Sequence, residues 1–114
     1  MIARGQVWDV NLDPTVGAEI KKTRPCVVVS SDKIGILPLK VIVPITQWQD
    51  AFEGQPWFVK IDPDTVNGLT RPSAADAFQV KSISTDRFVK QRGALSSEQM
   101  ADIVSAVALV LQVP

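Results

Sequence analysis

Few side chains in this sequence could do chemistry, because two of the usual catalytic residue types are missing. The 114 residues include neither histidine nor tyrosine, and the single cysteine, Cys26, lies in an apolar run that predicts burial. Without histidine there is no imidazole pair for acid–base catalysis and no Cys/His cluster for zinc. We therefore expect no metal and no other cofactor, and any reaction must use carboxylates, hydroxyls and cationic side chains.

The most informative stretch is residues 12–25, LDPTVGAEIKKTRP, where proline and glycine predict a loop between two strands. The loop carries the carboxylate of Glu19 and two lysines, Lys21 and Lys22, and Arg24 stands where the chain enters the next strand. A guanidinium stays charged at every relevant pH and matches two phosphate oxygens with a fixed fork of donors. Arg24 is therefore the strongest candidate for stabilising an anion, although such an arginine could also pair only with a surface carboxylate.

The overall charge does not draw the chain toward a polyanion. Twelve Lys and Arg residues balance twelve Asp and Glu residues, so any affinity for nucleic acid must come from local charge. Cationic residues cluster around Arg24 and again over residues 87–92. If the two groups converge in space they form a phosphate track, and if they do not they are two solvated patches; charge alone does not distinguish these alternatives.

The pattern of apolar residues predicts a mainly β fold with a C-terminal helix. Pro44 lacks a hydrogen-bond donor, so the strand that contains it must have an edge or a bulge there. Ser96 followed by Gln99 forms a capping box that begins a terminal helix. Together these elements describe a small, bent antiparallel sheet or open barrel with a helix packed across it. The expected strands are residues 6–12, 25–31, 39–46, 57–61 and 73–84.

Length and apolar content set the organisation of the chain. A chain of 114 residues and 12.4 kDa is expected to form one domain over residues 1–114. The terminal helix carries more apolar surface than one sheet face can cover, which predicts a homodimer. No segment approaches the ~20 apolar residues needed to span a bilayer and the first residues lack an apolar signal region, so we expect a cytoplasmic protein without membrane contact.

Several motifs resemble the MazF/PemK family of toxin endoribonucleases. The loop LDPTVGAE (residues 12–19) and the following TRPCVVVS (residues 23–30) are similar to the family's loop and second strand. The pieces follow the family order over nearly the whole chain. The other similar segments are VPIT at 43–46, LTRPS at 69–73, QVKSIS at 79–84 and GAL at 93–95.

The resemblance implies a fold, a reaction and partners. The fold would be a small SH3-like barrel of about five to seven antiparallel strands, assembled as a homodimer. The reaction would be sequence-selective, metal-independent cleavage of single-stranded RNA by the toxin of a type II toxin–antitoxin pair, and the protein partner would be a cognate antitoxin. RNA supplies its own nucleophile, the 2′-hydroxyl, so cleavage would leave a 2′,3′-cyclic phosphate and a 5′-hydroxyl.

The resemblance also implies roles for single residues. The residues that match Arg24 and Thr46 are the family's catalytic pair, and here they would have to meet across neighbouring strands. Glu19 is the best candidate for the general base, with a solvated loop charge as the alternative. Asp76 is a second candidate, although many family members instead carry an acid immediately before the glutamine that matches Gln79, where this chain has Phe78.

Binding of RNA would use further side chains. Lys21 and Lys22 could contact the backbone, and exposed aromatic rings could stack on bases. An alternating strand would put Asp76 and Phe78 on one face. For Trp48 and Trp57, core packing is the alternative to base stacking. The candidate RNA-binding residues are Lys21, Lys22, Trp48, Asp76, Phe78, Gln79 and Lys81.

One alternative function belongs to a different class. Related toxins on similar folds inhibit a protein target such as DNA topoisomerase without catalysis, and fold alone does not decide between the two functions. A protein-binding toxin would need neither the Arg24 and Thr46 pair nor the Glu19 loop, so these residues favour the nuclease.

Overall fold

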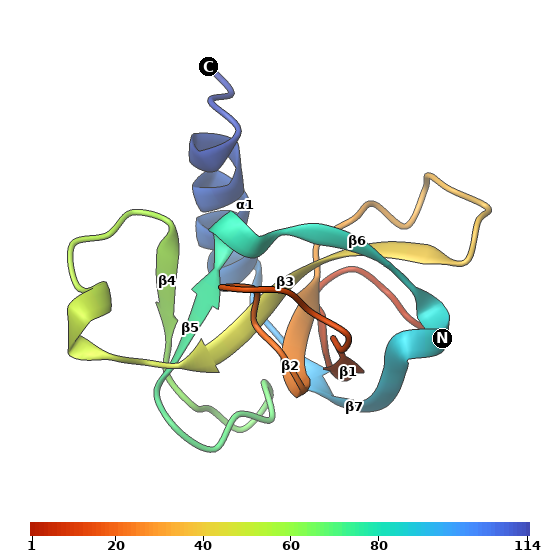
Figure 1. The fold of residues 1–114 in the computed structure, drawn as a ribbon, viewed down its shortest axis with the longest axis horizontal. Coiled ribbons are helices and arrows are strands. Elements are labelled where there is room, and N and C mark those ends of the chain that lie inside the picture. The colour runs from red at the N-terminus through yellow and green to blue at the C-terminus, as the bar shows by residue number, and fades with distance from the viewer.

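Seven antiparallel strands and one C-terminal helix build the chain in the computed structural model, which describes residues 1–114 (Figure 1). Three single-turn 3-10 helices lie in the connections after the third strand. The strands are β1 Gln6–Asn11, β2 Thr23–Val28, β3 Leu39–Gln47, β4 Phe58–Ile61, β5 Ser73–Asp76, β6 Lys81–Ser84 and β7 Phe88–Ala94. The helices are η1 Asp50–Phe52, η2 Ala77–Gln79, η3 Thr85–Arg87 and α1 Ser97–Val110.

β3 is the central strand of the sheet. The strand order is β4-β5-β3-β2-β1-β7, and β6 also pairs with β3. Along one edge of β3, β6 pairs with Leu39 to Ile42 and β5 pairs with Ile45 to Gln47. Pro44 falls between these two pairings, so the residue without an N–H lies at a break in the pairing along this edge of β3. This division of one long strand between two partners bends the sheet into the expected small barrel.

The strand expected over residues 73–84 is wrong in its middle. The chain leaves the sheet after β5, turns through η2 and re-enters as β6. The Asp76 carboxylate accepts the backbone N–H of Phe78 at 3.1 Å, a local bond that caps the turn in place of a ladder bond. Asp76 and Phe78 therefore do not share a strand face. β7 is a strand that the pattern did not predict, because three consecutive polar residues, Lys90 to Arg92, interrupt the apolar alternation of FVKQRGA; pairing with β1 fixes it.

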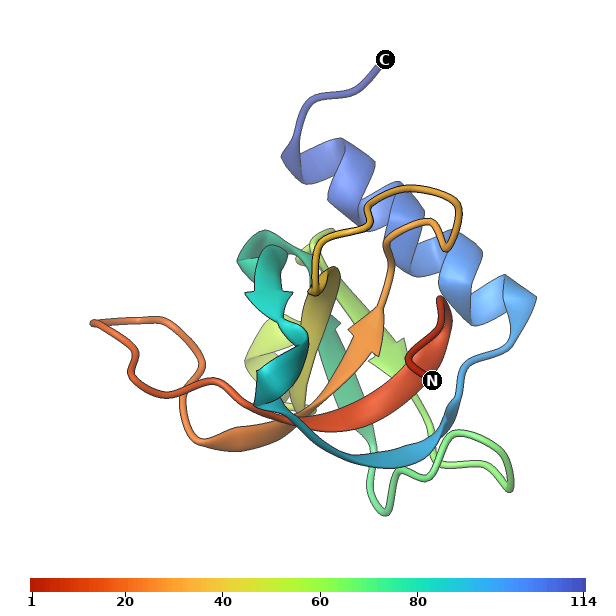
Figure 2. The same ribbon diagram turned by 90° about the vertical axis from the view of Figure 1, so that its right-hand side faces the viewer.

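Two apolar cores hold the barrel, each side chain contributing about 1.5–3 kcal/mol on burial. The larger core lies between the sheet and α1 and includes Val27, Val43 and Ile103. The smaller core includes Val10, Cys26, Val28 and Ile42, with Ile20 of the β1–β2 loop packed against it. Figure 2 shows α1 lying along one side of the barrel and the β1–β2 loop projecting from the other.

The helix begins at the expected capping box. Gln99 donates its backbone N–H to the Ser96 hydroxyl at 3.1 Å, and the Gln99 side chain accepts the Ser96 N–H at 2.8 Å. Met100, Ile103 and Ala106 are buried against the sheet. The apolar side chains Val104, Leu109 and Leu111 remain 39%, 55% and 62% exposed. No helix of the chain is both long enough and apolar enough to traverse a membrane.

Candidate active site

Arg24 and Thr46 lie at the same end of the two central strands. β2 and β3 pair antiparallel from Val28 and Ile42 to Cys26 and Pro44, and Arg24 and Thr46 each lie two residues beyond this last pair. Both residues are half-buried and line one cavity of about 340 Å³, at the end of the sheet where β2 begins and β3 ends. The two residues expected to act together across neighbouring strands thus border the same space.

This space, the arginine cavity, is strongly cationic. Arg24, Arg71 and Arg92 line it, and Asp9 is the one carboxylate among its lining residues. Positive charge is therefore concentrated in this cavity, although the net charge of the whole chain is zero. Such a cavity selects anions, and hydroxyls add further donors to phosphate oxygens. The hydroxyl-bearing residues that line it are Thr23, Thr46, Thr70 and Ser73.

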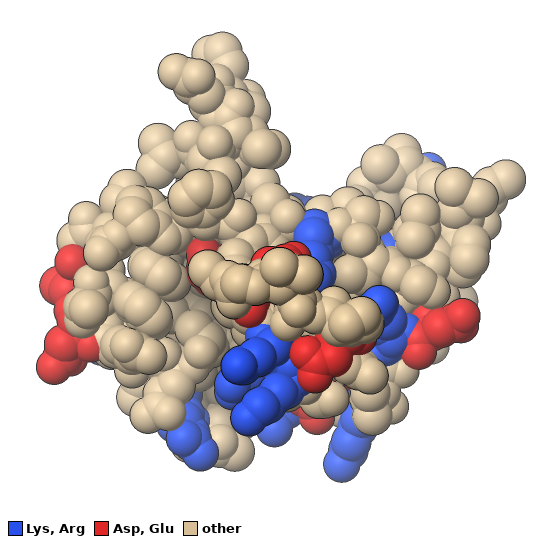
Figure 3. Space-filling view, viewed as in Figure 1, with Lys and Arg blue, Asp and Glu red and all other residues tan.

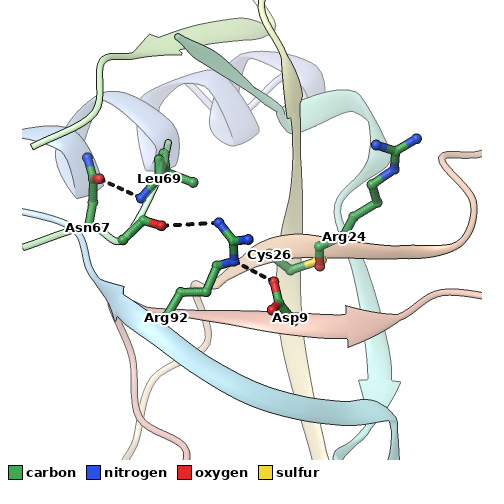
Figure 4. Close-up of polar contacts among 7 residues, drawn as sticks. Asp9, Arg24, Cys26, Asn67, Leu69 and Arg92 are labelled. Atoms are coloured by element: carbon green, nitrogen blue, oxygen red, sulfur yellow. Dashed lines mark hydrogen bonds and ion pairs between the residues drawn. The ribbon is translucent and has the colours of Figure 1, made fainter. Parts of the chain in front are cut away.

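Two of the three arginines were not singled out as site residues from the sequence. Arg71 lies in LTRPS, a segment noted only for its resemblance, and Arg92 lies in the second basic cluster. Their spacing in the sequence carries no sign that both border Arg24, because the sheet brings them together from the β4–β5 connection and from β7. In Figure 4 the Arg24 side chain points away from Arg92, and its Nε donates to the Lys21 carbonyl at 3.3 Å.

Arg92 is held rigidly by its neighbours. Its Nε donates to the Asp9 carboxylate at 2.7 Å and its Nη1 donates to the Gly68 carbonyl at 3.1 Å (Figure 4). The β4–β5 turn and β7 approach so closely that a Cβ at Gly68 would lie 2.3 Å from the Arg92 carbonyl oxygen. A Cβ at Gly93 would lie 2.2 Å from the Val66 carbonyl oxygen. Glycine at both positions is thus required to set the Arg92 backbone against this turn.

A buried asparagine shapes the same turn. Asn67 is fully buried; its amide donates to the Asp62 carbonyl at 3.0 Å and its side-chain oxygen accepts the Leu69 N–H at 3.0 Å. The Asp64 carboxylate accepts the N–H groups of Val66 and Asn67 at 2.8 and 2.7 Å. These backbone hydrogen bonds lower the pKa of Asp64. The turn is therefore a fixed support for Arg92 and not a loose loop.

A second space, the aromatic cavity, lies between the β1–β2 loop and η2. It has a volume of about 430 Å³, and half of its lining residues are hydrophobic, among them Trp57 and Phe78. The two rings meet edge to face with centroids 6.1 Å apart, and Phe78 is 66% exposed. Arg24 and Thr46 do not line this cavity. The candidate site residues that do are Glu19, Asp76, Phe78, Gln79 and Lys81.

Gln79 ties the β1–β2 loop to η2. Its side-chain oxygen accepts the Ile20 N–H at 2.6 Å, and its amide nitrogen donates to the Ala18 carbonyl at 3.2 Å. The same nitrogen donates to the Asp76 carboxylate at 3.3 Å. Burial raises the pKa of Asp76, against the opposing effect of hydrogen bonds from Phe78 and Gln79. Gln79 and Asp76 therefore fix the loop in place.

Glu19 does not lie with Arg24 and Thr46. Its carboxylate accepts the Val16 N–H at 2.7 Å inside the β1–β2 loop, and it borders the aromatic cavity. The expectation that it acts as general base beside Arg24 is not met in this arrangement, because the chain turns between the two residues and directs the carboxylate back into the loop.

The remaining candidates line neither cavity. Lys21 and Lys22 are exposed on the loop, and Lys22 has a positive φ of 70°. The Trp48 ring packs edge to face on Phe52 with centroids 5.7 Å apart, and the Lys60 ammonium lies 5.2 Å from its centre. Trp48 is thus engaged by its own chain, as the packing alternative predicts.

The two basic clusters of the sequence do converge in part. Arg92 lines the arginine cavity with Arg24, and a neighbouring hollow of about 260 Å³ adds Lys90. Arg87 has another task, since its guanidinium donates to backbone carbonyls at the start of the β1–β2 loop. Figure 3 shows Lys and Arg side chains gathered near the lower centre of its face, around β1 and β2.

Cys26 is fully buried in the smaller core, as its apolar surroundings predict. Burial raises the pKa of its thiol to about 12, so the thiol stays neutral and unreactive. It plays no part in either cavity.

Both the sequence and the fold match known proteins. Residues 3–111 match the family model of the PemK-like, MazF-like toxin of type II toxin–antitoxin system. Endoribonuclease MazF9 of Mycobacterium tuberculosis is 32% identical over 117 residues, which cover 97% of each chain. A mycobacterial endoribonuclease solved in complex with its cognate antitoxin has a TM-score of 0.79 at 22% identity, over 100% of this chain and 98% of that one. MazF of Deinococcus radiodurans has a TM-score of 0.78 at 21% identity, over 96% of each.

Proposed function

The chain belongs to the family of PemK-like, MazF-like toxins of type II toxin–antitoxin systems, and we propose that its reaction takes place in the arginine cavity. It is an endoribonuclease toxin of the MazF type. The observation that carries the location is that Arg24 and Thr46 line the same cavity. The alternative of a non-catalytic inhibitor is not favoured, since the related proteins named above are endoribonucleases.

The proposed reaction is transphosphorylation of single-stranded RNA. The ribose 2′-hydroxyl attacks the adjacent phosphorus, the bond to the 5′-oxygen breaks, and the products are a 2′,3′-cyclic phosphate and a 5′-hydroxyl. Arg24 stabilises the charge that develops on the non-bridging oxygens, and Thr46 donates its hydroxyl to the same phosphate. Three guanidiniums and one carboxylate are a poor donor set for a divalent cation, so the proposed cleavage needs no metal.

We assign no side chain to proton transfer: water takes the proton of the attacking 2′-hydroxyl and supplies one to the leaving 5′-oxygen. Glu19 is engaged by the Val16 N–H, so we assign it to the structure of the loop. Positioning of the attacking hydroxyl and charge stabilisation then supply the catalysis.

We assign recognition of a base to the aromatic cavity. Phe78 offers an exposed ring for stacking and Lys81 offers a cationic group to a base edge, while Asp76 and Gln79 hold the wall of the cavity. Lys21 and Lys22 would contact the RNA backbone from the loop. In this arrangement the arginine cavity binds the phosphate that is cleaved and the aromatic cavity binds a base.

We further propose an antitoxin partner and a homodimer. Structural relatives from mycobacteria and Deinococcus radiodurans are complexes of the toxin with its antitoxin. The exposed Val104, Leu109 and Leu111 support self-association through α1, for which sedimentation velocity would give twice the monomer mass. We place the toxin in the cytoplasm with its RNA substrate.

The test is cleavage of a long single-stranded RNA in EDTA. Wild-type protein should give discrete fragments with 2′,3′-cyclic phosphate ends. Arg24→Ala should lose about 2–4 kcal/mol of transition-state stabilisation, or about 30- to 1,000-fold in rate. Arg4→Ala is the matched control, because Arg4 lies outside the arginine cavity and its guanidinium donates to the Val29 carbonyl beyond the far end of β2. Equal rates for Arg24→Ala and wild type would refute the assignment.

A further inference from the structure

The arginine cavity continues into the hollow beside it. The two spaces share Asp9, Thr70 and Arg92, and the smaller one extends along β7 to Lys90. A ligand bound at Arg24 and Thr46 therefore has an open, polar path past Arg92. None of the residues lining the smaller hollow is hydrophobic, so the path suits a charged backbone and not a base.

Two cations along this path carry charge that the protein does not neutralise. The ion pair between Arg92 and Asp9 is the only salt bridge of the chain. Arg71 is exposed and donates to the neutral Gln47 side chain at 3.1 Å, and Lys90 is exposed without a carboxylate partner. Cations without carboxylate partners that lie along one cavity attract an anion, whereas an isolated surface cation is usually only hydrated.

Arg92, which lines both spaces, is fixed in advance. Asp9 and the Gly68 carbonyl each bind one guanidinium nitrogen, which leaves Nη2 free for an outside acceptor. The ion pair thus reduces the net charge of Arg92 but removes the entropy cost of orienting it. Arg71 and Lys90 supply the attraction, and Arg92 supplies a positioned donor.

We propose that Arg71, Arg92 and Lys90 form a second phosphate subsite, which binds the RNA backbone next to the phosphate that is cleaved. The inference rests on the proposed function of the arginine cavity. The subsite sets affinity and the direction in which the strand leaves the cavity. Because it contacts a phosphate that does not react, it contributes equally in the ground state and the transition state, and its loss raises KM more than it lowers kcat.

The experiment measures binding and cleavage as a function of salt. The probe is an RNA with the cleaved motif and a 2′-deoxyribose at the cleavage position, which binds without reacting; the same motif with ribose is used for kinetics. The variant Arg71→Ala/Lys90→Ala changes two exposed side chains and leaves the ion pair of Arg92 intact. The control Lys33→Ala removes an exposed lysine from the β2–β3 loop, outside both spaces.

The expected result is a shallower salt dependence for the double variant. Loss of one neutralised phosphate of a single strand should reduce the slope of log Kd against log salt by about 0.7, so we expect this reduction for the double variant. Its kcat should stay near that of wild type while its KM rises. Replacing the phosphate beside the cleaved position with an uncharged methylphosphonate should weaken RNA binding by the wild-type protein but not by the double variant. Lys33→Ala should match wild type in all of these.

Two outcomes are separable. If wild-type protein cleaves the RNA but the double variant keeps the wild-type slope and KM, the second subsite is wrong while the proposed function stands. If wild-type protein does not cleave, or if Arg24→Ala cleaves normally, the proposed function itself is wrong.

Discussion

Arg24 and Thr46 could be identified as a pair from sequence because their motifs resemble those of a known family, and β2 and β3 then carry both residues to one cavity. Arg71 and Arg92 could not be identified in the same way. They are 21 residues apart, and they share a cavity only because β7 returns beside β1 and the β4–β5 turn packs onto it. The two basic clusters of the sequence indicated a possible phosphate track, but they did not identify the cationic residues that would form it.

The role of Glu19 is the sharpest difference at this scale, and it gives a prediction. Glu19→Gln keeps a side-chain oxygen that can accept the Val16 N–H, so the loop should stay intact and the cleavage rate should fall by less than about tenfold. Loss of a general base would cost about 100- to 10,000-fold. Single-turnover kinetics at saturating protein measures the rate, with Glu53→Gln as an exposed control in the β3–β4 connection. A fall of the larger size would restore Glu19 as the proton acceptor.

Elements of the fold were predicted well where periodicity and end signals agreed. The capping box placed α1, and Pro44 placed the break in β3. The pattern did not predict the turn η2. The Asp76 carboxylate accepts the Phe78 backbone N–H, which a continuous strand would use in the sheet, and the alternation of apolar residues does not reveal this local hydrogen bond. That turn matters for the site, because it carries Gln79 to the β1–β2 loop.

The buried carboxyl of this turn makes stability depend on pH. The pKa of Asp76 is raised above its ordinary value of 3.8 by burial. In the window between these two pKa values the folded chain keeps a proton that the unfolded chain has released, so the contribution of Asp76 to stability falls as pH rises. Glu19 and Lys81 are the other charged groups that line the same cavity.

Urea unfolding at a series of pH values measures this effect. The free energy of unfolding of wild type relative to Asp76→Asn should decrease as pH rises through the window and then level off. The exposed control Asp86→Asn should run parallel to wild type. Parallel curves for Asp76→Asn and wild type would show that burial of this carboxyl has no energetic consequence.

At the scale of the whole molecule, a chain with no net charge separates a cationic space from an apolar one. β3 connects them, since Pro44 borders the aromatic cavity and Thr46 borders the arginine cavity. The sequence predicted the mainly β fold and the family. It could not predict that the candidate residues divide into two groups, because that division depends on which way the β1–β2 loop folds over the sheet.

The central claim is that the phosphate to be cleaved binds between Arg24 and Thr46. A crystal structure of the protein with an RNA that carries a 2′-deoxyribose at the cleavage position tests this most directly. We predict phosphate oxygens within about 2.7–3.2 Å of the Arg24 guanidinium and of the Thr46 hydroxyl. A phosphate bound elsewhere, with the Arg24 guanidinium still on the Lys21 carbonyl and the arginine cavity free of RNA, would contradict the account.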